Sequence, residues 1–247
     1  ELGTWPVNRE GVLWLSSLRD PTRAGFWQAA RQQVARLTPE QKQGLQLRHL
    51  PVLLHLQDQT LRMTRAQLVA QLTQRLAGQE HYLRGPTYDG PMRDHPQQFS
   101  RAAPKLVWAD LATIALLLEL LDDRALAAEL FAQADLDVAD TSTEHGGVID
   151  RVGADAQARF VAVAFPPMLV RHNHAYVPGQ DLFDRLYTSL AHYHFHAQDH
   201  ANSDHAGPGV GDLRTVAQLN FSGLVFTFID RQRLNVDYYQ PDGVVVD

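Results

Sequence analysis

Three histidines at alternate positions, in the run His192-Tyr193-His194-Phe195-His196, are the residues whose types and spacing point most directly to chemistry. Successive side chains of a β-strand point to opposite faces, so a strand here would place three imidazoles on one face. Imidazole is the commonest metal ligand among side chains. The run therefore predicts part of a metal site, and the alternative is a histidine-rich surface loop without an ion.

The register of this site stays open at the level of sequence. His192 with His194 is an alternative to His194 with His196, and the segment that follows offers spare ligands: His200, Asp204 and His205. A further alternate pair, His172 and His174, stands close to a Pro-Gly turn, and we expect it to be an exposed loop.

Hydrolytic zinc chemistry needs three protein ligands, an open position for water and a carboxylate that takes the proton from that water. His194, His196 and Asp212 can supply the ligands, and Glu144 can supply the proton shuttle. Each acid also has a structural interpretation. Glu144 could close a capping box, because it stands three residues after Thr141, and Asp212 could be a helix N-cap.

Composition narrows the classes of function. The chain has 247 residues, a net charge of −6 with histidine neutral, and 45% hydrophobic residues, which is ordinary for a globular protein with a real core. No basic stripe suited to nucleic acid is present. The absence of cysteine excludes disulfides and Cys-ligated zinc, so His, Asp or Glu must hold any metal.

No apolar run reaches the length of a membrane span. The longest candidate, Leu111 to Leu121, is interrupted by Thr113 and Glu119, and we expect it to be a buried helix. The chain begins at Glu1 rather than Met, which indicates a processed or trimmed product. Together with the missing cysteine, this favours an exported or periplasmic bacterial protein.

The first part of the chain is expected to be helical. Asp20-Pro21 is a typical helix start, and Thr38 and Thr64 each open a capping box with a Gln three residues later. Pro51 should kink or split the helix that begins near Pro39. Further helices are expected over 68–76, 105–121 and 123–134, with a Gly- and Pro-rich loop over 84–104.

The pattern changes near residues 136–142, which predicts a helical domain over 1–138 and a second, α+β domain over 139–247. Alternating and apolar runs predict strands over 146–149, 160–165, 190–196, 224–229, 234–239 and 243–246. Helices are expected over 181–189 and 212–219. The fold class is therefore α+β, with an all-helical first half.

The order of these pieces resembles the JAMM/MPN family of zinc metallopeptidases and deubiquitinases. That family has a Glu at the first strand, a short helix, a strand ending in H-x-H, and then a segment like P-S-x-x-D-L that opens a helix. The corresponding residues here are Glu144 with Gly146 and Gly147, then His194 and His196, then Pro208-Gly209-Val210-Gly211-Asp212-Leu213. The resemblance covers roughly residues 140–247, and the helical half is outside it.

The resemblance implies a mixed sheet flanked by helices, zinc on His194, His196 and Asp212, and Glu144 as the general acid/base. It implies hydrolysis of a peptide or isopeptide bond in a peptide or protein substrate, with the helical half facing substrate or partner.

Three features depart from the family pattern. Gly209 stands where the family has a Ser that stabilises the tetrahedral intermediate, so a backbone N–H or Ser203 would have to replace that hydroxyl. Sixteen positions separate His196 from Asp212, and this longer loop could displace Asp212 from the metal. Ala197 replaces the Pro that follows H-x-H. Two alternatives follow: a catalytically silent scaffold or binding protein, and a histidine-rich metal-binding protein.

Overall fold

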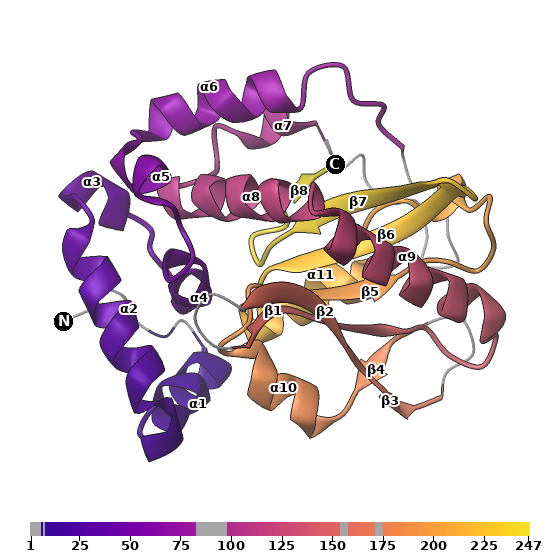
Figure 1. The fold of residues 1–247 in the computed structure, drawn as a ribbon, viewed down its shortest axis with the longest axis horizontal. Helices are drawn as coiled ribbons and strands as arrows, with labels where there is room; N and C mark the ends of the chain where they lie inside the picture. Colours follow the sequence, from indigo (N-terminus) through magenta and orange to yellow (C-terminus); the bar gives the residue numbers. More distant parts are fainter. Residues whose placement is uncertain (1–5, 7, 83–97, 154–157, 171–174) are drawn as a thin grey trace.

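The computed structural model describes residues 6, 8–82, 98–153, 158–170 and 175–247, and the first half of this described chain is helical (Figure 1). The helices up to residue 139, including the 3-10 turns η1 and η2, are α1 (Arg9–Ser17), η1 (Pro21–Arg23), α2 (Ala24–Arg36), α3 (Pro39–Lys42), η2 (Leu47–His49), α4 (Leu50–Leu53), α5 (Asp58–Arg62), α6 (Arg65–Arg75), α7 (Phe99–Ala102), α8 (Trp108–Leu121) and α9 (Arg124–Ala139).

Side-chain caps begin several of these helices where the sequence predicts them. The Asp20 side chain accepts the N–H of Thr22 at η1, which runs into α2. Thr38 opens α3 and Thr64 opens α6, each in a reciprocal capping box with the Gln three residues later. These capping predictions are confirmed.

The helix expected from Pro39 to Pro51 is broken earlier than the sequence suggests. Helix α3 ends at Lys42, and Gly44 then takes a left-handed conformation with φ of 71°. Its Cα also lies so close to the Val107 side chain that a Cβ would be 2.6 Å from Cγ1. Pro51 falls in the first turn of α4, where its missing N–H costs nothing, so it does not cause the break.

A mixed sheet forms the second half, with the strand order β2-β1-β5-β6-β7-β8. Strands β5 and β6 are parallel, and the other neighbours are antiparallel. A small two-stranded sheet, β3–β4, stands beside it. The strands are β1 (Gly146–Val152), β2 (Arg159–Phe165), β3 (Pro167–Leu169), β4 (Val177–Pro178), β5 (Ala191–Phe195), β6 (Gly223–Asp230), β7 (Arg233–Tyr239) and β8 (Val245–Val246).

Both faces of the sheet are covered, because side chains alternate along each strand. Tyr193 and Phe195 of β5 point into the core shared with α8 and α9. The opposite face, with Val148 and Val225, packs against α10 (Gln180–Leu186) and α11 (Val210–Leu219). Figure 1 shows α8 and α9 crossing in front of the sheet and α11 behind it. The fold is therefore α+β, with a mixed sheet between helices.

One apolar core runs through the boundary proposed at residue 138. It joins helical residues such as Leu68 and Leu111 to sheet residues such as Phe226. Arg48 adds polar contacts, since its guanidinium donates to Asp110, to Ser222 Oγ (2.9 Å) and to Tyr238 OH (3.2 Å). The division into two domains stays a prediction.

Several expectations fall wholly or partly outside the described residues. The His172–His174 pair lies outside them, as does most of the loop expected over 84–104, whose described end contains α7. Among the described helices, none is long and apolar enough to cross a membrane, and the apolar run from Leu111 is the buried helix α8.

Candidate metal centre

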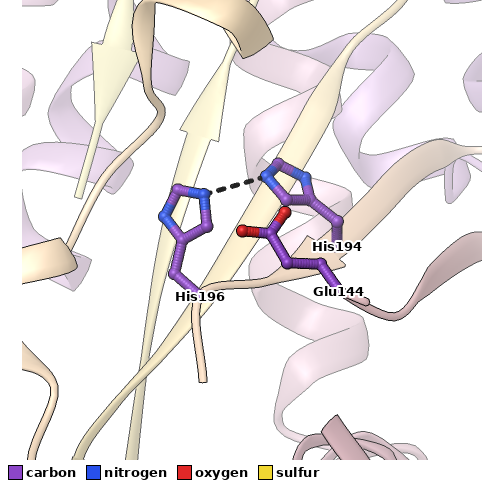
Figure 2. A group of neighbouring side chains, drawn as sticks. All are labelled: Glu144, His194 and His196. Atoms are coloured by element: carbon purple, nitrogen blue, oxygen red, sulfur yellow. Dashed lines mark hydrogen bonds between the residues drawn. The ribbon is translucent and has the colours of Figure 1, made fainter. Parts of the chain in front are cut away.

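Strand β5 presents two histidines to one point. His194 lies on the strand and His196 follows its end, and both are buried, with 2% and 7% exposure. Their Nε2 atoms are 3.2 Å apart, as the dashed line in Figure 2 marks. The alternation predicted from the sequence therefore places these two imidazoles on one side.

Glu144 reaches the same point because of the register between β1 and β5. Gly146 pairs with His194, and the N–H of Phe195 donates to the His145 carbonyl (3.1 Å), which brings Glu144 opposite His196. Figure 2 shows the Glu144 carboxylate directed at the space between the two rings. No helix begins at Thr141, so the capping-box interpretation of Glu144 does not apply.

Gly147 allows the close approach of strands that the sequence suggested after Glu144. A Cβ built at this position would lie 2.0 Å from the Val163 carbonyl oxygen of β2 and 2.8 Å from the Tyr193 hydroxyl. A side chain would therefore push β1 away from its neighbours, and with it the segment that carries Glu144.

Asp212 supplies a second carboxylate from the first turn of α11. Its Oδ1 is 3.4 Å from His194 Nε2, and its Oδ2 is 3.6 Å from His196 Nε2. The long loop after His196 thus leaves Asp212 beside both rings.

The start of α11 differs from the expected one. The helix begins at Val210 with Gly209 as its N-cap, so Asp212 is the third helical residue rather than the N-cap. Its Oδ2 accepts the Gly209 N–H at 2.6 Å. This N–H is therefore committed to Asp212, although the sequence suggested it as a donor to a reaction intermediate.

Contacts behind the rings fix their orientation. The His205 carbonyl can only accept, so His196 Nδ1, 3.0 Å away, carries the proton and leaves Nε2 toward His194. His194 Nδ1 is 3.4 Å from the Tyr239 hydroxyl. Outer partners of this kind hold the tautomer and ring angle of metal-binding histidines.

The electrostatics of the cluster favour positive charge at its centre. Burial tends to lower the pKa of His194, but Asp212, Glu144 and Asp137 outweigh it and raise that pKa above its ordinary value. Burial tends to raise the pKa of Asp212, yet the charge and hydrogen bond of His194 and the charge of His196 hold it well below its ordinary value. A proton or a metal ion would satisfy this demand.

Within the described ranges, Glu144, His194 and His196 form a group that could hold a metal ion, with one ligand atom from each lying within 4.8 Å of the others. Asp212 adds a carboxylate within 3.6 Å of both imidazole nitrogens. The set offers two nitrogen and two carboxylate donors, which suits zinc or a similar divalent ion.

Asp137 is a neighbour of this cluster that the sequence analysis did not single out. It is 2% exposed, and it accepts backbone N–H groups from His145, at 2.5 Å, and from Ala197. Burial, with a smaller contribution from Glu144, raises its pKa to about 8. The sequence pattern could have indicated this burial, since Asp137 continues the buried face of α9 formed by Leu126, Leu130 and Ala134.

The remaining candidate residues lie around the cluster rather than in it. His192 shares the face of His194, at 5.7 Å between ring centroids, but stacks on Tyr176. His200 bonds Asp135 of α9 (2.9 Å). Ser203 and Asp204 belong to the 3-10 turn η4 (Ser203–His205), and neither is in the group that could hold a metal.

No family model, no curated protein and no solved structure matches this chain.

Proposed function

We propose that this protein is a zinc-dependent hydrolase of amide bonds, a peptidase or isopeptidase of the JAMM type. The observation that carries the proposal is the convergence of the His194 and His196 Nε2 atoms, 3.2 Å apart, with the Asp212 carboxylate beside both. A zinc ion at such a centre lowers the pKa of a water molecule and polarises a carbonyl group.

The donor set fits zinc. Two imidazoles and one carboxylate are a common ligand set of catalytic zinc, which leaves a fourth position open. The His205 carbonyl fixes His196 in the tautomer with Nε2 available, and the Gly209 N–H holds Asp212. Hydrogen bonds that orient the ligands in this way are typical of metal sites, and they support the proposal.

Glu144 has a role separate from the ligands in this proposal. Its carboxylate faces the rings from the segment that leads into β1, while Asp212 comes from α11. Glu144 takes a proton from water and passes it to the leaving amine. Asp212 and the two histidines hold the metal.

Substitution of each acid separates these roles. In Glu144→Gln we expect stoichiometric zinc to remain bound, by elemental analysis, while hydrolysis of a peptide mixture, followed by mass spectrometry, falls at least about a hundred-fold. In Asp212→Asn and His194→Ala we expect zinc to be lost. His200→Ala is the matched control, since this ring bonds Asp135 outside the cluster.

Zinc loss in Glu144→Gln would make Glu144 a ligand, and full activity in that variant would reject its role as a base. Wild-type protein without bound zinc would reject the proposal itself.

A catalytically silent metal-binding protein is the second candidate, and one observation favours it. The Gly209 N–H, at the position where the resemblance places a stabilising Ser, is bonded to Asp212. One tightly bound zinc without hydrolysis of any peptide would support this candidate. Several metal ions per chain would instead indicate a histidine-rich metal-binding protein.

A further inference from the structure

A cavity of about 260 Å³ opens beside the metal centre and shares two of its residues, His194 and Asp212. It lies between β4, β5, β7, α10 and α11. Pockets that take a whole drug-sized ligand are about 300–1,000 Å³. This cavity is therefore the size of one large side chain rather than of a long peptide segment.

The cavity walls away from the metal centre are apolar and aromatic. They include Val177 and Pro178 of the β3–β4 hairpin, Phe183 of α10, and Phe221. Tyr176 also lines the cavity. Its hydroxyl donates to the Phe165 carbonyl (2.9 Å), so mainly its ring can contact a bound group. Asp212, the acid among the lining residues, stands at the metal end.

His192 contributes its ring to the wall. Its ring is 8% exposed, stacks on Tyr176 and lies 5.3 Å from the Phe221 ring. Its Nδ1 is buried and has no hydrogen-bond partner among the described residues. The stacked ring thus adds to the aromatic surface of the cavity.

The hairpin next to the cavity continues the apolar surface into solvent. Met168, Leu169 and Val170 are consecutive and 62%, 42% and 63% exposed. Leu169 pairs with Val177, which lines the cavity. Consecutive exposed apolar residues usually mark a binding surface.

We propose that this cavity receives an aromatic or large aliphatic side chain of the substrate, from a residue adjacent to the amide bond that is cleaved. The inference rests on the proposed hydrolase function, because it takes the neighbouring metal centre as the place of cleavage. An acidic side chain would meet apolar walls and the Asp212 carboxylate, so it should be rejected.

Capped pentapeptides of the form acetyl-Gly-Gly-X-Gly-Gly-amide, with X as Phe, Leu, Ala, Asp or Lys, test this specificity. Binding is measured by NMR chemical-shift titration on Glu144→Gln, with and without added zinc, and cleavage is measured on the wild type. We expect Phe and Leu peptides to bind at least about ten-fold more tightly than Ala or Asp peptides, as burial of a large apolar side chain predicts.

Thr215→Trp tests the location. Thr215 lines the cavity from an exposed position on α11, so a Trp there should fill the cavity and abolish the preference for Phe. Ala217→Trp is the matched control, because Ala217 is exposed on the same helix and is not among the lining residues. The control should keep the preference.

The two proposals fail in different ways. Equal binding of all five peptides, or a preference that survives Thr215→Trp, would overturn the specificity inference even if peptides are cleaved. Selective binding of Phe and Leu peptides without cleavage at any zinc concentration would leave the specificity of the cavity standing and overturn the hydrolase function.

Discussion

Asp137 joins the two segments that carry the candidate ligands. Its carboxylate accepts the N–H that follows Glu144 and the N–H that follows His196, and it does so from a buried face of α9. A helix outside the region of the motif resemblance thereby reaches the metal centre. Geometry of this kind is set by the packing of α9 on the sheet, so the motif alone could not reveal it.

Asp137→Ala should destabilise the fold by about 1–3 kcal/mol, because two buried N–H groups lose their acceptor. It should also weaken zinc binding, since the segments of Glu144 and His196 are then less well fixed. Urea unfolding and a competitive zinc titration measure these effects. Asp137→Asn keeps an acceptor oxygen and should recover most of both.

Asp135→Ala is the surface control for this prediction. Asp135 lies on the same helix, 61% exposed, and pairs with His200. Its loss should change stability by less than about 0.5 kcal/mol. If both variants lost stability and zinc binding equally, the centre would depend on α9 as a whole rather than on the Asp137 carboxylate.

Individual elements show how far local sequence rules reach. The caps at Thr38 and Thr64 and the alternation of β5 depend on neighbouring residues, and they could be predicted. Hairpin strands β3 and β4 were not predicted, because Pro167 and Pro178 in them indicate turns. The cavity was not predicted either, since it joins β4, α10 and β5 to α11 and β7, which are distant in the chain.

Substitutions of two glycines should change the stability of the protein in opposite directions, because the packing around them differs. Gly147→Ala should destabilise the protein by about 1–3 kcal/mol, because its methyl group would overlap the β2 backbone. Gly25→Ala in α2 should stabilise it by about 0.4–1 kcal/mol, since no atom of the described residues lies within 4 Å of the added Cβ. Thermal unfolding of both variants measures the contrast, and a stabilising Gly147→Ala would contradict the strand spacing described above.

At the scale of the whole molecule, a buried polar group connects the helices to the sheet. Arg48 and His49 both contact Asp110, and Arg48 continues to Tyr238 of β7. His49 Nδ1 accepts the Gln46 N–H (2.9 Å), so its Nε2–H donates to Asp110 and the ring is neutral. Burial and the neighbouring Arg48 lower the pKa of His49 to about 4.

Protonation of His49 in acid should therefore weaken the fold, whereas Asp137, whose pKa burial raises to about 8, acts in the opposite direction. The unfolded chain takes up a proton at His49 near pH 6.5, whereas the folded chain resists it down to about pH 4. Stability from this group is complete above pH 6.5 and declines as the pH falls toward 4. His55, whose pKa burial also lowers to about 4, acts in the same direction. Urea midpoints at pH 7 and pH 5, compared between the wild type and a variant without this ring, measure the contribution of His49.

His49→Gln gives the control for this pH effect. The variant lacks the titrating ring, so its midpoint at pH 5, relative to that at pH 7, should be higher than in the wild type. An unchanged difference would assign the acid sensitivity to other groups.

In the chain between His196 and α11, hydrogen bonds hold the backbone on both sides of the exposed residues 198–199. Asn202 bonds the His196 carbonyl (2.6 Å) and the Phe228 carbonyl (2.9 Å), while Gln198 and Asp199 stand in solvent. Doubling the length of a flexible loop costs only about 0.6 kcal/mol. We therefore expect extra residues at this stretch to change the rim of the site without disturbing the centre.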